Sequence, residues 1–441
     1  MTDCFVSQMR FGFYSGKAVV ADFAGGQIST DAGLLPLRAF DERHRLTASL
    51  AQGLPDGRDQ NHVQHSSLTI LRQRMYQIVA GYEDAVDADQ LRHDPVFQLL
   101  ADGPAGKPLA SQPTLSRWEN AFTGRDWVRL NDLQLDWFVR VCRRQVQRNG
   151  ELVLDIDSTE DRTYGQQEFS SFTRPYDRTM YHPLLVFERR TGYLLAARLR
   201  PGGCSSSLGC VPVLRRILER VRREFPRISI YLCADAAFPV PTLLEWAERY
   251  RLHYAIGRPS DKAVNRKAEH LRAKLERRWQ HQHVPQRGFT SFRHRNWRAR
   301  RQRRICCKAE HSLHGSTLRY VVTNLAGRAE EVFAFYQGRG DCENRIEELK
   351  NGFAADRLSC HRYLANVFRL MLHSLAYNLV VLLRLHLPEQ LRTAQIEKLR
   401  LQVFKLGARI RRTARRVWVH FSTGWPYQAL FLRVCHVVNR S

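Results

Sequence analysis

The sequence predicts an α/β protein built around a mixed β-sheet that is covered by helices on both faces. Two observations predict this fold class. Apolar residues recur with helical spacing over most of residues 1–150, and at Glu151 this pattern changes to short runs rich in β-branched and aromatic residues. Residues 151–257 then follow the order strand, strand, strand, helix, strand, helix, strand, which describes a meander followed by alternating helices and strands.

Local patterns place each element of this sheet. Residues 152–157 form a β-rich run, and residues 181–187 and 193–199 flank a polar turn, as the two arms of a hairpin do. An amphipathic helix is expected over residues 211–224, a buried strand over 228–233, a helix begun by proline over 239–251, and another strand over 252–257. In this topology the strand at 228–233 is expected to lie beside the first strand.

Residues 1–146 are predicted to be mostly helical after a short extended start at residues 17–23. Helical apolar spacing is evident over residues 65–80, and a short helix with Pro113 in its first turn follows in the segment ASQPTLSRWENAF. Arg117 lies near the start of that helix, where a recognition helix presents side chains to the major groove of DNA. The segment is therefore either a DNA-reading helix or a plain structural helix.

Composition limits the class of partner. The chain has 441 residues, a formal net charge of +26 and a pI near 10.2, which indicates a polyanion such as DNA or RNA. The most apolar run, residues 370–383, is too short to cross a bilayer, and the N-terminus lacks the layout of a signal peptide. Ten scattered cysteines without a CxxC pair suit a reducing compartment. We expect a cytoplasmic, nucleoid-associated protein that does not bind a membrane.

Two basic stretches are candidates for phosphate binding. Residues 258–326 begin with a basic helix at 262–280 and continue with a dense arginine run, and residues 387–441 form a basic tail that is expected to be helical. Such runs often decorate a solvated face, but a surface without that purpose would mix charges of both signs. The candidate DNA contacts in these stretches are Trp297, Arg298, Arg300, Arg301, Arg411, Arg412 and Arg415.

Acidic residues stand at the ends of two predicted strands. Asp155 and Asp157 are two residues apart on the first strand, so both point to one face of the sheet, and Asp235 ends the fourth strand. Any one of them could simply cap a turn. Carboxylates gathered in a small space repel one another, and a bound divalent cation removes that repulsion. Ligation by carboxylates alone favours Mg²⁺ or Mn²⁺.

The segment YQGRGDCENRIEELK adds a third acidic element. Read as one helix, it places Tyr336, Arg339, Glu343, Glu347 and Lys350 on one face. This pattern is typical of a solvated helix with ion pairs, and it also suits a group that holds a metal ion beside a phosphate.

Three motifs together resemble those of a known family. LDIDSTEDRTYGQQE, CADAAF and YQGRGDCENRIEELK are similar to the acidic motifs of DDE-type insertion-sequence transposases, which have a ribonuclease-H-like catalytic domain. The last motif fits that family's Y-(2)-R-(3)-E-(6)-K signature, and the whole chain resembles the insertion-sequence 1380 family. The resemblance implies that Asp157, Asp235 and Glu343 are the catalytic residues and hold two Mg²⁺ or Mn²⁺ ions, with Asp155 as the alternative first ligand.

The resemblance also implies roles for the remaining candidates. Tyr336, Arg339 and Lys350 would contact DNA, and the stretch between Asp235 and Glu343 would be an insertion domain. In related transposases an insertion-domain tryptophan stacks on an extruded base, so Trp297 is expected either to do this or to fill a small β core. The sequence GGCSSSLG departs from the family at the turn after the third strand.

The predicted function is a transposase that cuts element ends and joins the 3′-hydroxyl to target DNA by two-metal-ion phosphoryl transfer. Its expected partners are double-stranded DNA, comprising terminal inverted repeats and target DNA, and a second copy of the chain in a homodimer. A ribonuclease-H-fold nuclease or resolvase without strand transfer, or a catalytically idle DNA-binding protein, remains an alternative. Five segments are expected. Residues 1–146 form a mostly helical DNA-binding region, 147–257 and 327–386 form the two parts of the catalytic domain, 258–326 form the basic insertion domain, and 387–441 form a basic helical C-terminal region.

Overall fold

The computed structural model describes residues 8–54, 56–104, 106–295 and 301–440. These residues fall into two compact units, each of which is described by itself. Unit 1 draws on Met1–Gln52, Asp56–Arg117 and Leu383–Ser441, and unit 2 comprises Gly53–Pro55 and Trp118–Leu382. The domain boundaries expected from the sequence remain predictions.

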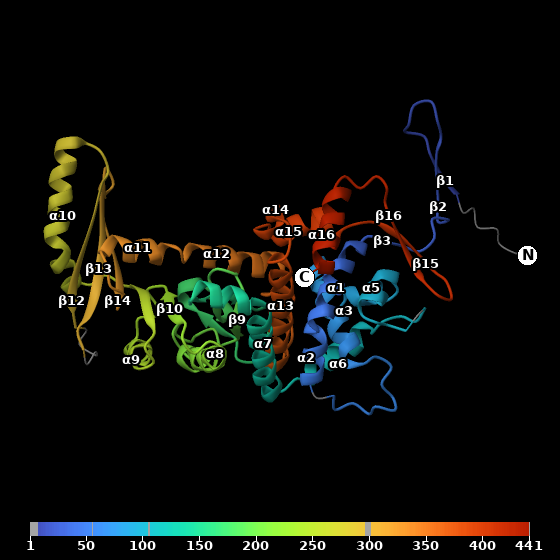
Figure 1. Ribbon diagram of the computed structural model, residues 1–441, viewed down its shortest axis with the longest axis horizontal. Coiled ribbons are helices and arrows are strands. Elements are labelled where there is room, and N and C mark those ends of the chain that lie inside the picture. The colour runs from blue at the N-terminus through green and yellow to red at the C-terminus, as the bar shows by residue number, and fades with distance from the viewer. Residues whose placement is uncertain (1–7, 55, 105, 296–300, 441) are drawn as a thin grey trace, which may run out of the picture. The chain divides into compact units, whose positions relative to one another are not determined.

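Unit 2 is built on an eight-stranded mixed sheet (Figure 1). Its strand order is β12-β13-β14-β11-β10-β4-β8-β9. The strands are β4 (Glu151–Ser158), β8 (Leu184–Glu188), β9 (Leu194–Arg198), β10 (Ser229–Ala234), β11 (His253–Arg258), β12 (Gln286–His294), β13 (Arg303–Ser312) and β14 (Gly315–Thr323). A smaller sheet in the order β5-β7-β6 comprises β5 (Asp161–Arg162), β7 (Arg178–Tyr181) and β6 (Ser171–Thr173), with the single turn η2 (Arg174–Tyr176) between β6 and β7.

The first five strands of the large sheet have the ribonuclease-H-like arrangement that the sequence predicts. β4, β8 and β9 form an antiparallel meander, and β10 then pairs with β4 in parallel. β11 follows in parallel on the outer side of β10. The expected neighbourhood of the first and fourth strands is therefore confirmed, and it brings the carboxyl ends of β4 and β10 together.

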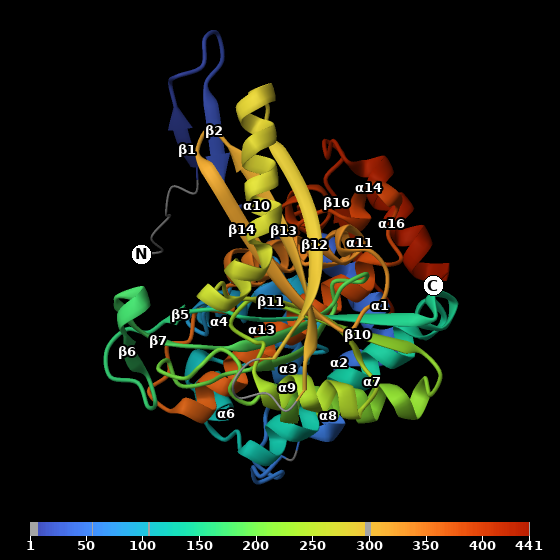
Figure 2. The same cartoon turned by 90° about the vertical axis from the view of Figure 1, so that its left-hand side faces the viewer.

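The basic stretch after β11 continues the same sheet. β14 pairs antiparallel with β11, and β13 and β12 extend the sheet beyond it. Side chains on β13 alternate between two helices: Cys306 packs with α11 (Ala329–Gln337), whereas Ile305 and Cys307 pack with α10 (Lys262–Gln282). Figure 2 shows α10 running along these strands. Helices therefore cover both faces, as predicted.

The other helices of unit 2 pack around this sheet. They are α7 (Gly124–Asn149), α8 (Cys210–Glu224), α9 (Pro241–Arg249), α12 (Gly340–Glu347), the π-helical turn η3 (Glu348–Gly352) and α13 (Tyr363–Arg384). Helix α13 has the length and apolar composition of a membrane span, but its apolar segment is entirely buried inside the protein. It is long and apolar because it is a core helix.

Unit 1 is mostly helical, with short strands at its edges. Its helices are α1 (Leu35–His44), α2 (Leu46–Gly53), α3 (Ser67–Ala80), α4 (Asp87–Leu91), α5 (Pro95–Leu100), α14 (Glu389–Arg392), α15 (Ile396–Leu399) and α16 (Gln428–Arg440), with η1 (Ala32–Leu34) and the π-helical η4 (Arg400–Phe404). Helix α6 (Gln112–Asn120) begins in unit 1 and ends in unit 2. β1 (Gln8–Phe11) and β2 (Val19–Asp22) form a separate hairpin.

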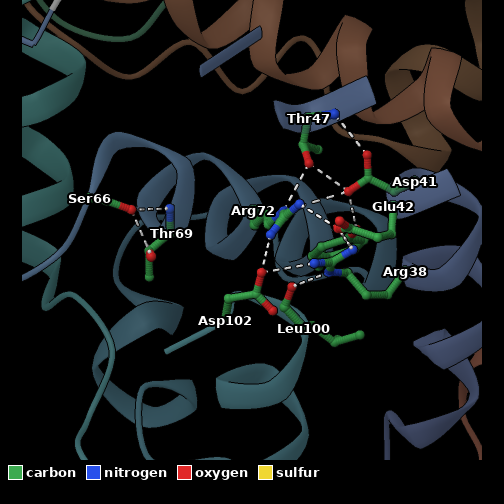
Figure 3. A network of polar contacts seen from close by, with 10 residues as sticks. Arg38, Asp41, Glu42, Thr47, Ser66, Thr69, Arg72, Leu100 and Asp102 are labelled. Atoms are coloured by element: carbon green, nitrogen blue, oxygen red, sulfur yellow. Dashed lines mark hydrogen bonds and ion pairs between the residues drawn. The ribbon is translucent and has the colours of Figure 1, made fainter. Parts of the chain in front are cut away.

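A buried polar network joins the helices of unit 1 (Figure 3). The Arg72 guanidinium on α3 donates to Thr47 Oγ1 at 2.9 Å and pairs with Glu42 at 3.0 Å and with Asp102. Asp41 on α1 accepts the Thr47 backbone N–H at 2.7 Å. Because the Arg72 side chain is nearly inaccessible to water, these carboxylates compensate its burial and fix α1, α2 and α3 together.

The basic tail is not helical throughout, contrary to expectation. Residues 408–421 form a hairpin of β15 (Ala408–Arg412) and β16 (Val417–Phe421), and β15 pairs on its other side with β3 (Ile28–Ser29). The physical reason is the period of two in ARIRR, where Ala408 and Ile410 are buried while Arg409 and Arg411 are exposed. Helix α16 follows this hairpin, so the expectation holds for the last helix.

Candidate active site

Three acidic residues lie at the carboxyl ends of the parallel strands β4 and β10. Asp155 pairs with Cys233 in the ladder, and Ile156 pairs with Ala234. Asp157 lies near the carboxyl end of β4 and Asp235 directly follows β10, so the register places them side by side on the face that carries Cys233 and packs against α11. Their proximity also shows in their electrostatics, because the charge of Asp235 helps to raise the pKa of Asp157.

Asp155 is fully buried and is held by arginines. The Arg189 guanidinium donates to both carboxylate oxygens, from Nε at 3.0 Å to Oδ2 and from Nη2 at 2.6 Å to Oδ1. Arg345 on α12 lies 3.9 Å away and hydrogen-bonds the Arg189 carbonyl. Burial alone would lower the pKa of Arg189, but its hydrogen bonds to Asp155 raise that pKa above the usual range. Asp155 and Arg189 therefore form a buried ion pair inside the protein.

Asp157 has a different environment. Its side chain is 9 % exposed, its Oδ1 accepts the Ser158 backbone N–H at 2.8 Å, and its Oδ2 accepts from Arg339 Nη2 at 2.6 Å. Burial raises the pKa of Asp157; Arg339 opposes this shift and Asp235 adds to it. This carboxylate thus lies at an edge of the core beside a second carboxylate, where its negative charge is only partly compensated.

The segment predicted as one helix is broken at Gly338. Tyr336 lies at the end of α11, Arg339 caps the start of α12, and Lys350 lies in the π-helical turn η3. Glycines on both sides of Arg339 explain the break, since glycine weakens a helix interior. Arg339 and Glu343 still meet at 3.4 Å across one turn, and the Glu343 side chain is 69 % exposed. Arg339 therefore bridges Asp157 and Glu343.

Tyr336 and Gly257 meet beside Asp235. A Cβ atom added to Gly257, on β11, would lie 2.6 Å from the Tyr336 hydroxyl and 3.0 Å from the carbonyl carbon of Asp235. Burial raises the pKa of the Tyr336 hydroxyl, and Asp235 and Asp157 add to that shift while Arg339 opposes it. The absence of a side chain at Gly257 is what lets this hydroxyl approach the end of β10.

Lys350 contacts the chain immediately after the first acidic strand. Its Nζ donates to the Glu160 carbonyl and to Thr159 Oγ1 at 3.5 Å, and it lies 3.9 Å from Asp161 Oδ1. Asp161 is buried, and burial raises its pKa to about 8, a shift that Lys350 opposes. Lys350 therefore holds the loop that leaves Asp157, which is a positioning contact that the sequence did not indicate.

The sequence matches the family model described as "Transposase DDE domain group 1" over residues 11–441, nearly its whole length. The chain belongs to this family of DDE transposases.

Two further comparisons add little to this assignment. A search of curated proteins finds no match. Among solved structures, a piggyBac transposase synaptic complex with hairpin DNA is similar with a TM-score of 0.41 and 12 % sequence identity, covering 85 % of this chain and 80 % of that chain. This is a loose similarity, so the assignment depends on the family match. Membership implies an enzyme that cuts DNA.

The donor set of the transposase fits a hard divalent cation, although Arg339 lies between two of the donors. Over residues 8–54, 56–104, 106–295 and 301–440, no three His, Cys, Asp or Glu side chains are gathered closely enough to enclose a metal ion. Asp157, Asp235 and Glu343 nevertheless offer only carboxylate oxygens, which Mg²⁺ and Mn²⁺ prefer. Burial raises the pKa of Asp157 most, and repulsion from Asp235 raises it further. A cation held by these carboxylates would relieve that repulsion.

The candidate DNA contacts of the transposase are distributed over both units. Arg301 lines a cavity of about 340 Å³ next to Ala236, together with Arg258 and Arg303. Arg117 is exposed on α6, where it is 3.5 Å from Thr114 Oγ1. In unit 1, Arg411 and Arg415 are exposed while Arg412 turns inward and donates to Gln98 at 3.0 Å. Trp297, Arg298 and Arg300 lie outside the described residues.

Sequence reasoning missed three residues that build the site. Arg189 was predicted only to lie in the hairpin turn, and Gly257 was predicted only to end a strand. No role was predicted for Asp161. Signals existed for two of them. A carboxylate in the middle of a buried strand requires a cationic partner, and an isolated glycine in a strand often marks a close approach. The sequence contains 69 Lys and Arg residues, so it could not identify Arg189 as that partner.

Proposed function

We propose that this DDE transposase cuts DNA at the ends of a mobile element and joins the freed 3′-hydroxyl to target DNA. The observation that supports this most is the position of Asp157 beside Asp235 at the ends of adjacent strands, with Arg339 linking Asp157 to Glu343. Clustered carboxylates beside an arginine suit a phosphodiester that must be held and attacked. The motifs quoted above extend the proposal to the insertion-sequence 1380 family.

In this proposal Asp157, Asp235 and Glu343 are the ligands for Mg²⁺ or Mn²⁺. Such ions supply Lewis-acid stabilisation of charge on the phosphoryl oxygens when they are bound. Asp157 is preferred over Asp155 as the first ligand, because both oxygens of Asp155 already accept hydrogen bonds from Arg189. Replacing that pair would leave Arg189 without a carboxylate partner in the core.

The basic and aromatic side chains have separate roles in the proposal. Arg339 holds Asp157 and Glu343 in one arrangement, and the exposed part of its guanidinium, whose side chain is 14 % exposed, can also donate to a phosphate oxygen of DNA. Tyr336 directs its hydroxyl to the strand ends, where it can orient a phosphate or a water. Lys350 keeps the loop after Asp157 in place.

A labelled-end assay tests this function. The substrate is duplex DNA taken from the flanks of the reading frame and carrying an inverted repeat, with the strand to be transferred labelled on the element side of the expected nick. With Mg²⁺, the wild-type protein should nick the element end and transfer the labelled 3′-hydroxyl to a second duplex. Asp235→Asn and Glu343→Gln should each reduce both steps by more than about a hundredfold, because removing even a residue that orients a metal ligand costs about 10–100-fold.

DNA binding provides the control. Both variants should bind the same duplex as tightly as the wild type, since affinity comes from many phosphate contacts outside the carboxylate cluster. Cleavage at the wild-type rate in either variant would overturn the assignment of the carboxylates. Nicking without joining would instead identify a nuclease or resolvase, and binding without metal-dependent nicking would identify a catalytically idle DNA-binding protein.

A further inference from the structure

The β15–β16 hairpin of unit 1 has one packed face and one solvent face. In an antiparallel pair, residues directly opposite each other point to the same side. Ala408 and Ile410 are buried, Phe421 packs at 5.1 Å against Phe431 of α16, and Arg412 turns inward to Gln98. These contacts hold this side of the hairpin (β15 and β16 in Figure 1) to the rest of unit 1.

The opposite side combines arginines with aromatic rings. Arg409 is directly opposite His420, and Arg411 is directly opposite Trp418, so these four side chains share the solvent face. The Trp418 and His420 rings are parallel, with centroids 6.0 Å apart, and the Arg416 guanidinium lies 5.9 Å from the centre of the Trp418 ring. Trp418 is 46 % exposed. We call these five residues the ribbon face.

The hairpin carries charge of one sign only. Residues 408–421 contain five arginines and one histidine, and they contain no aspartate or glutamate. A solvated surface usually mixes both signs, and here a half-exposed tryptophan lies beside arginines for which no ion pair is seen among the residues that the structure describes. A polyanion with apolar groups in a groove complements both features of the ribbon face.

The backbone is also held rigid. Ile410 N donates to Gln27 O at 2.8 Å, β3 pairs with β15, and Thr413 closes the turn through hydrogen bonds with Arg416 in both directions. Arg409 and Arg411, two residues apart on one strand, are about 6.8 Å apart along it, which matches the rise of two base pairs of B-DNA. Because β3 pairs with β15 only at Ala408 and Arg409, the rest of the hairpin is a two-stranded ribbon, which the major groove is wide enough to admit.

We propose that the ribbon face binds the major groove of duplex DNA, with Arg409, Arg411 and Arg416 on phosphates or base edges and Trp418 against the groove. The proposal rests on the transposase function above, for which it supplies a DNA-contacting surface separate from the carboxylate site. It differs from the sequence-based expectation, which placed the contacts of this segment on a helix and included Arg412.

Equilibrium binding of the full chain to a fluorescent duplex tests the ribbon face. The binding buffer contains a chelator and no divalent metal ion, so that no cleavage occurs. Arg409→Gln/Arg411→Gln should weaken binding at least tenfold at physiological salt and should lower the slope of log affinity against log salt by about 1.8, since each phosphate contact contributes about 0.9. Trp418→Ala should weaken binding without changing the slope, because it removes no charge.

The matched control is Arg433→Gln/Arg440→Gln, which removes two exposed arginines from α16 in the same unit. Its affinity and slope should remain near those of the wild type, and far-UV circular dichroism should show every variant folded. Equal losses in both double variants would mean general charge attraction and would overturn the proposal. A loss confined to single-stranded DNA would overturn the major-groove assignment.

The same experiment separates this inference from the proposed function. If the wild-type protein binds and cleaves duplex DNA while Arg409→Gln/Arg411→Gln binds it equally well, the ribbon face is wrong and the transposase function stands. If the wild-type protein binds no DNA at all under low-salt conditions, both proposals fail.

Discussion

Asp155 and Asp157 are two residues apart on β4, yet their contacts predict opposite consequences of the same substitution. Asp155→Asn should destabilise unit 2 and leave the cleavage chemistry in place, whereas Asp157→Asn should leave stability nearly unchanged and abolish cleavage. Each change replaces one oxygen by an amide nitrogen and keeps the shape of the side chain. The two variants are therefore each other's matched control.

The magnitude for Asp155→Asn follows from its partner. Arg189 donates from Nε and Nη2 to this carboxylate, and Asp155 is the carboxylate that raises the pKa of Arg189 most among the described residues. Breaking a buried ion pair costs about 3–5 kcal/mol, because the remaining charge is left uncompensated. The remaining bond from Arg189 to the Phe335 carbonyl, 2.8 Å long, favours the lower value. For a unit of this size, about 3 kcal/mol lowers the melting midpoint by roughly 6 °C.

The expected cost of Asp157→Asn is smaller, about 1 kcal/mol or less. Arg339 keeps Glu343 at 3.4 Å and still feels the charge of Asp235. The substitution also removes a carboxylate whose pKa is raised by burial, so part of the lost pairing is offset. Cleavage should nevertheless fall by more than about a hundredfold if this carboxylate holds a metal ion.

Thermal melting followed by far-UV circular dichroism, together with nicking measured well below both midpoints, decides between the two roles. The reasoning is refuted if Asp155→Asn melts like the wild type and loses cleavage while Asp157→Asn still cleaves. In that case Asp155 is the first ligand and the Arg189 pair is replaced during function. Loss of both properties in both variants would mean that the whole cluster is one cooperative structure.

Two further changes test the surroundings of the site. Gly257→Ala should cost about 1–3 kcal/mol and slow cleavage, because its Cβ would lie 2.6 Å from the Tyr336 hydroxyl. Gly124→Ala, at the start of α7 in the same unit, meets nothing within 4 Å and is the control, and equal melting and cleavage of the two variants would contradict the close approach. Burial raises the pKa of Asp161 to about 8, above its unfolded value near 3.9, so the folded state retains a proton that the unfolded state releases over this range. The stability contributed by this proton is full below about pH 4 and is lost as the pH rises through about 8, by at most about 1.4 kcal/mol per pH unit. Asp161→Asn should lack this decline in urea unfolding, and parallel curves for the two proteins would exclude the effect.

The first five strands of the unit 2 sheet could be predicted because they are apolar runs between polar turns, whereas β12 and β13 were missed because basic and polar residues interrupt their apolar positions. The predicted strands at 228–233 and 252–257 match β10 and β11 within one residue at each end. The β15–β16 hairpin was missed because the arginines of ARIRRTARR obscured an alternation whose only apolar members are Ala408 and Ile410. The break at Gly338 was missed because the YREK spacing fits a continuous helix equally well.

The acidic residues of the site could be predicted from their places at strand ends, but their partners could not. The bond between Arg189 and Asp155 spans 34 residues, and the bond between Arg339 and Asp157 spans 182. Such pairs depend on strand register and helix packing, which local patterns do not encode. Because Asp155 is buried, its need for a cationic partner was predictable. That Arg189 is this partner depends on the turn between β8 and β9, which brings Arg189 against the Phe335 carbonyl of α11.

The distribution of charge explains why an acidic cluster persists in a chain with a net charge of +26. The negative charge of Asp155 is compensated by its own partner, Arg189. Asp157, Asp235 and Glu343 bring three carboxylates to a region where the structure supplies one shared guanidinium, that of Arg339. The uncompensated charge is therefore about that of one divalent cation, and a second ion would require negative charge from elsewhere. The phosphates of bound DNA carry that charge, and Mg²⁺ is commonly held by one or two carboxylates together with substrate phosphates. If two ions act as proposed, the second would therefore depend on the phosphates of bound DNA for its negative charge.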